Sequence, residues 1–194
     1  MRKKILVDES IFVIAHRSND SMHSQLMMFL EQSEKNDPNR KYDLFLTSIS
    51  RKRMGMYKWF QMKCVMKCIW CDAPRKEAMQ KRRWRMRIAK KLIVGIKKKS
   101  LRETLFKSKL MDIFMYANEF KSQFIEKQEN RRIIPEEVIP LESCAIAQVA
   151  HRTGMPLLSF NTDYRFFCHL PLSPDTYMTY LSPEVFLSHN VQPR

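Results

Sequence analysis

Glycine is scarce in this chain, which has only three glycines among its 194 residues. That shortage argues against folds that hold a cofactor in repeated glycine-rich turns. Long apolar runs are missing as well, and none approaches the length of a membrane-spanning helix. Between Lys4 and Asp8 the amino terminus has too few apolar residues for the core of a signal peptide. We therefore expect a cytoplasmic protein that does not enter a membrane.

Acidic residues are also few relative to basic ones. The chain has 20 Asp and Glu against 35 Lys and Arg, a formal net charge of +15 with a pI near 9.8. An excess of this size attracts a polyanion, most simply nucleic acid, with a membrane surface as the competing partner.

The basic residues concentrate between residues 51 and 99, where only Asp72 and Glu77 oppose them. Each Lys or Arg placed on a phosphate releases counterions, so we expect this region to guide RNA. The side chains expected to contact RNA are Arg51, Lys52, Arg53, Arg82, Arg83, Arg85, Arg87, Lys90 and Lys91. Trp84, Ile88 and Leu92 recur there at helical spacing, which also fits a solvated basic face over a buried Trp84.

The length and the 44% apolar content fit one domain, residues 1–194, with a sizeable core. We expect residues 51–132 to form a basic helical elaboration of that domain. The region includes a helix that ends near Pro74 and a long amphipathic helix at residues 100–128. The apolar side of the long helix suits packing across a sheet or across the partner of a homodimer.

Residues 140–166 have the pattern of one α/β unit. A helix begins near Glu142 and ends at Gly154, where glycine can adopt the left-handed conformation of a helix cap. Residues 155–160 form an apolar run short enough for a buried strand, and a polar turn follows it. Further strands are expected at 4–7, 42–47 and 177–181, and further helices at 10–16, 21–33 and 183–187. The pattern predicts a three-layer α/β fold with a mostly parallel sheet.

Three acidic residues are placed to meet at one edge of this sheet. Asp8 directly follows the first strand, Asp163 follows the strand at 155–160, and Glu142 lies at the helix entrance. If those two strands are parallel neighbours, their carboxyl ends emerge together, where open α/β sheets bind ligands. Carboxylate oxygens suit Mg²⁺ or Mn²⁺, and such a cluster can cleave phosphodiesters. We therefore predict that Asp8, Glu142 and Asp163 are the catalytic and metal-binding residues.

Four segments, taken in order, resemble a PIN domain. They are Ile-Leu-Val-Asp at residues 5–8, Glu142 opening an alanine-rich helix, residues 156–163 with Phe166 behind them, and residues 180–187. The resemblance covers roughly residues 3–50 and 133–189. Toxin-type members of this family are metal-dependent ribonucleases, and members often pair with a small antitoxin protein. The resemblance thus implies a PIN-like fold, cleavage of RNA with Mg²⁺ or Mn²⁺, and a partner of the antitoxin type.

The sequence departs from the family pattern at three positions. The family usually has Asp on the alanine-rich helix, whereas Ser143 stands there in this chain and Glu142 comes one residue early. A Glu usually follows the second strand, but this chain has Arg53 in that region. After the strand at 155–160, either Asn161 or Asp163 could take the acidic position. The residues expected to support the site are Ser10, Ser143 and Asn161. These departures motivate a second hypothesis, a PIN-like module that binds nucleic acid without cleaving it.

Cys64, Cys68 and Cys71 form a C-x3-C-x2-C cluster. This spacing resembles the iron–sulfur motif of radical S-adenosylmethionine enzymes and gives a third hypothesis, an iron–sulfur enzyme, which the shortage of glycine opposes. The same spacing would put the three thiols on one face of a helix with Tyr57 and Phe60, as in a buried stripe of small residues. A structural zinc site is the remaining alternative.

Overall fold

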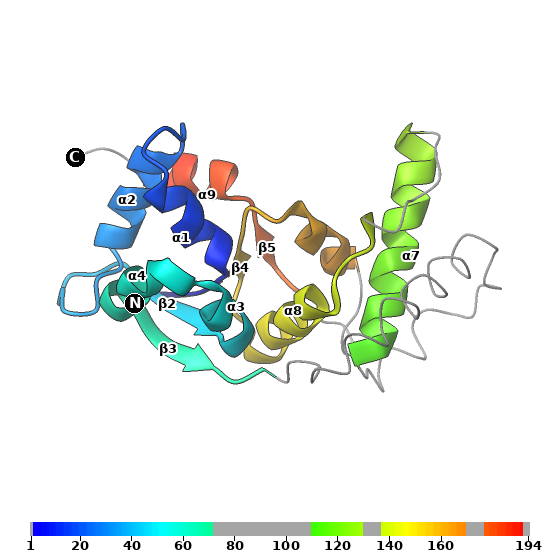
Figure 1. Ribbon diagram of the computed structural model, residues 1–194, viewed down its shortest axis with the longest axis horizontal. Helices are drawn as coiled ribbons and strands as arrows, with labels where there is room; N and C mark the ends of the chain where they lie inside the picture. The colour runs from blue at the N-terminus through cyan, green and yellow to red at the C-terminus, as the bar shows by residue number, and fades with distance from the viewer. Residues whose placement is uncertain (1, 72–109, 130–136, 170–176, 192–194) are drawn as a thin grey trace.

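The computed structural model describes residues 2–71, 110–129, 137–169 and 177–191 (Figure 1). The expected helix around Trp84 lies outside these residues, as do the first ten residues of the helix expected at 100–128. None of the described helices is long and apolar enough to cross a membrane.

A five-stranded parallel sheet forms the centre of the described fold. Its strands are β1 (Lys3–Val7), β2 (Tyr42–Thr47), β3 (Val65–Ile69), β4 (Leu157–Leu158) and β5 (Tyr180–Leu181). They lie in the order β3-β2-β1-β4-β5, and every neighbouring pair is parallel. The first strand and the strand before Asp163 are therefore parallel neighbours, which is the condition on which the predicted acidic site depends.

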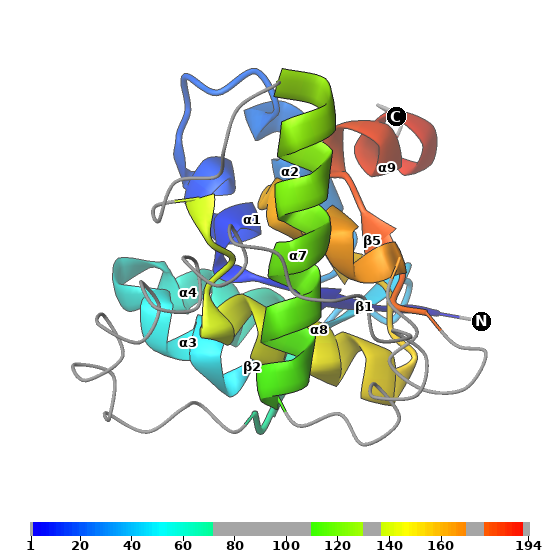
Figure 2. The ribbon, with the colours of Figure 1, turned by 90° about the vertical axis from the view of Figure 1, so that its right-hand side faces the viewer.

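Helices cover both faces of the sheet, which gives three layers (Figure 1). One face packs on α1 (Glu9–His16), α2 (His23–Glu31) and α9 (Pro183–Asn190), and the other packs on α7 (Leu110–Glu129) and α8 (Leu141–Thr153). In β1 the fully buried Leu6 joins the core under α7 and α8, whereas Ile5 and Val7 join the core under α1 and α2. This alternation is what a strand buried on both faces requires. Figure 2 shows α7 as the outermost helix on its side, in front of α8.

Three short helices connect β2 to β3: α3 (Ser48–Arg53), η1 (Gly55–Tyr57) and α4 (Lys58–Cys64). A further short helix, η4 (Thr162–His169), follows β4. The Thr47 side chain caps α3 by accepting a hydrogen bond from the Ser50 amide at 3.1 Å. Gly154 ends α8 with a φ of 64°, as its left-handed cap position predicted.

Several expected elements need correction. The helix expected to carry all three cysteines is wrong, because α4 ends at Cys64 and residues 65–69 are the edge strand β3. Part of the helical elaboration expected at 51–132 therefore belongs to the sheet. The expected strands at 155–160 and 177–181 are reduced to two paired residues each, and the polar turn at 161–163 opens the 3₁₀ helix η4.

Candidate functional site

The connections of the sheet reverse direction next to β1. After β1 the chain moves to β2 and then β3 on one side, and β4 and β5 lie on the other side of β1. The carboxyl ends of β1 and β4 therefore form a topological switch point, where open α/β sheets bind ligands. The register pairs Val7 with Leu158 and with Leu46, so Asp8, Ser159 and Thr47 follow at one level across three strands.

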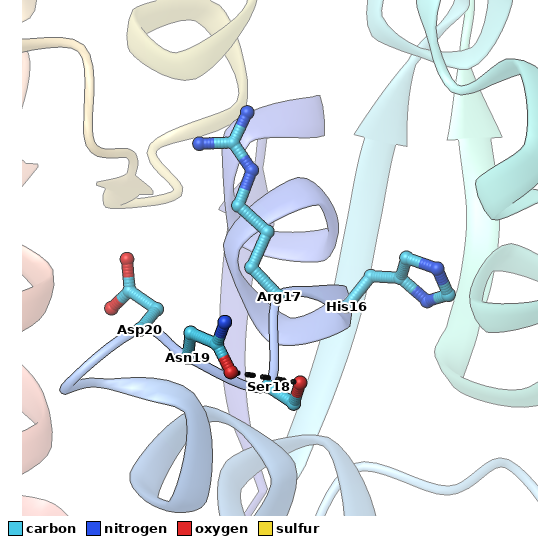
Figure 3. A pocket seen from close by; sticks show the side chains of 5 residues that line it. All are labelled: His16, Arg17, Ser18, Asn19 and Asp20. Carbon is cyan, nitrogen blue, oxygen red and sulfur yellow. Dashed lines mark hydrogen bonds between the residues drawn. The ribbon is translucent and has the colours of Figure 1, made fainter.

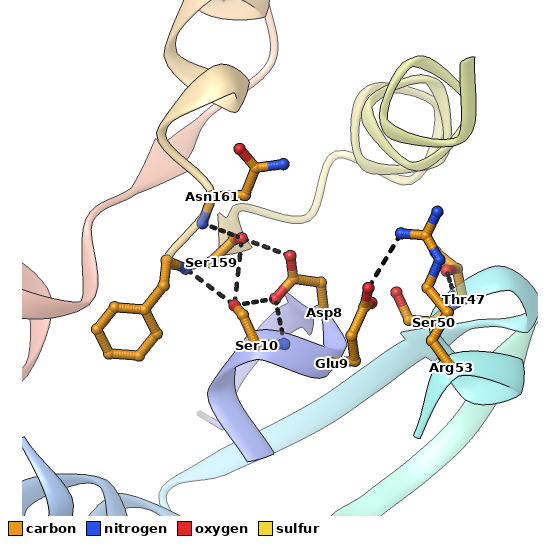
Figure 4. Close-up of polar contacts among 9 residues, drawn as sticks. Asp8, Glu9, Ser10, Thr47, Ser50, Arg53, Ser159 and Asn161 are labelled. Atoms are coloured by element: carbon orange, nitrogen blue, oxygen red, sulfur yellow. Dashed lines mark hydrogen bonds and ion pairs between the residues drawn. The ribbon is translucent and has the colours of Figure 1, made fainter. Parts of the chain in front are cut away.

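Asp8 is the central carboxylate of this switch point. It is the N-cap of α1, where its Oδ1 accepts a hydrogen bond from the Ser10 amide at 3.0 Å and another from the Ser10 hydroxyl. Its Oδ2 accepts a hydrogen bond from the Ser159 hydroxyl at 2.5 Å. The residue is only 4% exposed, so both carboxylate oxygens are held inside the protein (Figure 4).

The two serine hydroxyls also order the loop after β4. The Ser10 hydroxyl oxygen accepts a hydrogen bond from the Phe160 amide at 3.0 Å, and the Ser159 oxygen accepts one from the Asn161 amide at 2.9 Å. Each hydroxyl thus donates its one proton to Asp8 and accepts a backbone proton. Ser10 was expected to support the site, whereas Ser159 was missed. Its signal was available, because it is the one polar residue within the apolar run predicted at 155–160.

Burial raises the pKa of Asp8 from 3.8 to about 6. The hydrogen bonds from Ser10 and Ser159 lower the pKa and so oppose this shift, while the nearby charge of Glu9 adds to it. A carboxyl group with a pKa moved toward neutrality at a ligand-binding edge is a feature of functional sites. Asp8 is therefore the strongest single candidate among the predicted catalytic residues.

Arg53 occupies the side of the site next to β2. Its guanidinium donates a hydrogen bond to Glu9 Oε1 at 3.0 Å in an ion pair (Figure 4). Burial lowers the pKa of Arg53, but the hydrogen bond that it donates to Glu9 and the charges of Glu9 and Glu142 raise the pKa overall. PIN domains usually have an acid in this region. In this chain the residue is Arg53, whose positive charge interacts with the carboxylates of Glu9 and Glu142.

Two buried oxygens beside this ion pair have no hydrogen-bond partner among the described residues. They are Glu9 Oε2 and Ser50 Oγ. Ser50 is fully buried in α3, and Figure 4 shows it on the same side of the site as Glu9 and Arg53. Buried oxygens without a partner are uncommon, so they mark the place in this site where a ligand group or water would be accommodated.

Asp163 is paired with Lys121 of α7. The Lys121 ammonium lies 2.7 Å from Asp163 Oδ1, and the two side chains are 13% and 21% exposed. The Asp163 amide donates a hydrogen bond to Asn161 Oδ1 at 3.0 Å. Asn161, which was expected to support the site, thus contacts the backbone of Asp163, whereas Lys121 was not predicted.

Glu142 and Ser143 open α8, which begins at the carboxyl edge of the sheet. Glu142 is half-buried in the first turn of the helix, and its charge acts on Arg53 and on the thiol of Cys144. Ser143 is buried, and a hydrogen bond between its side chain and Tyr164 lowers the pKa of the Tyr164 phenol against the larger effect of burial. Ser143, which was expected to support the site, therefore forms a hydrogen bond with Tyr164.

Two of the three predicted metal ligands, Asp8 and Asp163, already have partners within the protein. Asp163 is bonded to Lys121, and both oxygens of Asp8 accept hydrogen bonds from serine. Within the described ranges, no group of three or more His, Cys, Asp or Glu side chains is arranged to hold a metal ion. A cation bound by Asp8, Glu142 and Asp163 would first have to displace the ammonium group of Lys121.

The three clustered cysteines point to different places. Cys64 is buried in the core under α1 and α2, where its thiol donates to the Leu30 carbonyl at 3.4 Å. Cys71 is buried in the opposite core, where its thiol donates to the Ala145 carbonyl at 3.4 Å. Cys68 lies in β3 beside Arg51, whose charge and hydrogen bond lower the thiol pKa against the larger effect of burial. The expected single face of thiols is therefore wrong, although burial of Cys64 and Cys71 agrees with a packing role.

Only three of the nine residues predicted to contact RNA are described. Arg51, Lys52 and Arg53 are exposed on α3, at the carboxyl end of β2. The other six, between residues 82 and 91, lie outside the described residues. The described part of the predicted basic surface is therefore adjacent to the switch point.

A separate hollow lies at the end of α1, lined by residues 16–20 (Figure 3). Figure 3 shows the side chains of His16, Arg17 and Asp20 pointing in different directions. The His16 ring packs edge-on against Tyr57, with ring centroids 5.3 Å apart. This hollow has no convergent set of polar groups and is not a second active-site candidate.

Comparisons with protein-family models and with curated proteins found no match to this chain.

Proposed function

We propose that this protein binds single-stranded RNA at the carboxyl edge of its sheet, as a PIN-like module whose acidic site is neutralised by its own cations. The observation that carries the proposal is the pairing of two site carboxylates with basic side chains: Asp163 with Lys121 and Glu9 with Arg53. Unpaired carboxylates would repel phosphate, whereas these pairs remove much of that repulsion.

The charge of the whole chain supports the same proposal. A net charge of +15 draws a polyanion to the protein, and exposed Arg51 and Lys52 stand beside the switch point. The α/β architecture with helices on both faces of a parallel sheet is compatible with the resemblance to PIN domains.

Charge reversal on α3 tests the proposal. We expect Arg51→Glu with Lys52→Glu to weaken binding of a fluorescent single-stranded RNA at least about tenfold, because two phosphate contacts are lost and two repulsions gained. The matched control is Lys4→Glu with Lys41→Glu, which changes the net charge equally at the opposite edge of the sheet. Fluorescence anisotropy at several salt concentrations gives both affinities. Equal losses in the two variants, or no binding by the wild type, would contradict the proposal.

A second candidate function is metal-dependent cleavage of RNA. It is favoured by the raised pKa of Asp8 at the switch point and by the unpartnered oxygen of Glu9. The test is incubation of RNA with the wild type and with Asp8→Asn, in Mg²⁺, in Mn²⁺ and in chelator. Cleavage that needs the metal and disappears in Asp8→Asn supports a nuclease. RNA that stays intact while bound supports the binding module alone.

A further inference from the structure

Arg165 is an exposed basic residue of η4, the short helix that follows β4. Its guanidinium carbon lies 4.6 Å from the ring centroid of Phe124 on α7 and 4.8 Å from that of Phe166. The two rings pack edge-on against each other, with their centroids 5.6 Å apart. Aromatic rings attract a cation through their quadrupoles, so these contacts hold the guanidinium at the surface without neutralising its charge.

The N–H groups of this guanidinium are left for a ligand. Within the described ranges, Arg165 forms no hydrogen bond and no ion pair. Asp163, the acid two residues before it, is bound instead to Lys121 at 2.7 Å. Arg53, in contrast, is paired with Glu9 at 3.0 Å. Arg165 therefore combines a held position with an uncompensated charge and unused hydrogen-bond donors.

Tyr180 of β5 connects Arg165 to the candidate site. The Tyr180 hydroxyl donates a hydrogen bond to the Ser159 carbonyl at 3.0 Å, and the Ser159 hydroxyl donates one to Asp8. Burial raises the pKa of Tyr180 to about 12; the charge of Asp8 adds to this shift, and the charge of Arg165 opposes it. The charges of Asp8 and Arg165 thus act on one phenol, which places Arg165 beside the switch point, on the side of β4 and β5.

The chemistry of Arg165 favours a phosphate group as its ligand. Arginine presents its N–H groups in a planar fork that matches two oxygens of a phosphate. Because the rings hold the guanidinium in advance, less conformational entropy is lost when the phosphate binds. The net charge of +15 favours a polyanion over an isolated anion. A phosphodiester of a nucleic-acid backbone agrees with both the local and the overall charge.

We infer that Arg165 binds a backbone phosphate of single-stranded RNA, with Phe124 and Phe166 holding its guanidinium in position. The inference rests on the proposed function and extends it. The exposed basic residues of α3 contact the RNA on the β2 side of Asp8, and Arg165 contacts it on the β4 side. The RNA strand therefore crosses the carboxyl edge of the sheet over Asp8.

Arg17 provides a matched control. It is also an exposed arginine, and it directly follows α1. Helix α1 begins after Asp8 at the carboxyl edge and has eight residues. At about 1.5 Å per residue, the helix carries Arg17 about 12 Å away from its start. Arg17→Gln thus removes the same charge as Arg165→Gln, but outside the proposed RNA path.

The experiment measures binding of a short oligouridine RNA by fluorescence anisotropy at several salt concentrations. We expect Arg165→Gln to weaken binding at least about fivefold, because one phosphate contact is lost. The slope of the logarithm of affinity against the logarithm of salt should become shallower by about 0.7. Arg17→Gln should change the affinity less than about twofold and leave the slope unchanged.

Two further variants separate the position of the guanidinium from its charge. Arg165→Lys keeps the charge but loses the planar fork, and Phe124→Leu keeps Arg165 but removes one of the rings that hold it. We expect each variant to weaken RNA binding about twofold to threefold. The salt slope should stay as in the wild type, because neither variant removes a charge.

The outcomes separate this inference from the proposed function. If the wild type binds the oligouridine and Arg165→Gln loses no more affinity than Arg17→Gln, the phosphate site is wrong and RNA binding stands. If Arg165→Gln weakens binding of a polyglutamate peptide to the same extent, the site takes any anion, and its assignment to an RNA phosphate is wrong. If the wild type does not bind the oligouridine, both proposals fail. Circular dichroism of each variant checks that the fold is intact.

Discussion

The described α/β fold and the segment at residues 72–109 differ sharply in charge. The described residues carry 17 Lys and Arg against 15 Asp and Glu, whereas residues 72–109 carry 15 against 3. The segment thus contributes a net charge of +12 to the +15 of the chain. The difference teaches that the excess positive charge, and with it the attraction of a polyanion, is concentrated in one part of the sequence. The described residues are nearly neutral and so repel one another little, while residues 72–109 supply most of the long-range attraction.

The largest expected effect comes from removing charge in the segment. We expect replacement of the six predicted contacts between residues 82 and 91 by glutamine to weaken RNA binding at least about a hundredfold at moderate salt. The salt dependence should become shallower, because each phosphate contact on a single strand contributes about 0.7 to the slope. The melting temperature should change little if the two regions are independent. A large loss of stability with unchanged binding would reverse the assignment.

The next effect concerns the scaffold and its buried carboxyl group. Because the pKa of Asp8 is raised from 3.8 to about 6 in the folded protein, its contribution to stability is fully present below pH 3.8 and is lost as the pH rises through 6. A shift of about two units corresponds to about 3 kcal/mol. We therefore expect Asp8→Asn to gain about that much stability relative to wild type between pH 4 and pH 7.

Urea unfolding at a series of pH values measures this difference. The comparison of wild type with Asp8→Asn removes the contributions of other carboxylates, which both proteins share. A constant difference between pH 4 and pH 7 would contradict the raised pKa. The amide of asparagine could fail to accept the hydrogen bonds of both Ser10 and Ser159. In that case Asp8→Ser is a second variant that removes the carboxyl group.

The smallest effect concerns the pairing of Lys121 with Asp163. A double-mutant cycle with Lys121→Met and Asp163→Asn should give a coupling free energy of up to about 1 kcal/mol, because both side chains are only partly exposed. The same two variants also test whether the described fold contributes to RNA binding beside residues 72–109. Lys121→Met leaves Asp163 unpaired beside the site, so it should weaken RNA binding by more than Asp163→Asn does. Equal binding by the two variants would mean that this pair lies off the RNA path.

The strands nearest the site could be predicted because their sequence signals are local. Tyr42–Thr47 is an alternating apolar run whose observed limits equal the predicted ones, and Gly154 ends α8 where a glycine cap was expected. The parallel pairing of β1 with β4 was a condition of the site prediction, and the register of the sheet meets it. Local patterns and simple topology therefore gave the position of Asp8.

Other features depend on tertiary contacts that no local pattern carries. The cysteine spacing i, i+4, i+7 suggested a helix, but pairing of Val65–Ile69 with β2 selects a strand instead. Lys121 meets Asp163 across two elements that are 42 residues apart, so its role is invisible in a single sequence. The arrangement of carboxylates likewise depends on which cations reach them. The identity of the site residues was predictable, and their partners were not.

The position of β1 between β2 and β4 has a consequence for synthesis of the protein. β2 can pair with β1 early, but the other side of β1 receives its partner only when Leu157 and Leu158 have been made. At about 5 to 20 residues per second, the ribosome needs roughly 5 to 20 s to add the residues between the end of β2 and β4. During that time the Leu6 amide, which later donates to the Pro156 carbonyl, stands on an open edge. An open edge of this kind can pair with another chain, so we expect β1 to be protected from such pairing only after the residues of β4 have been made.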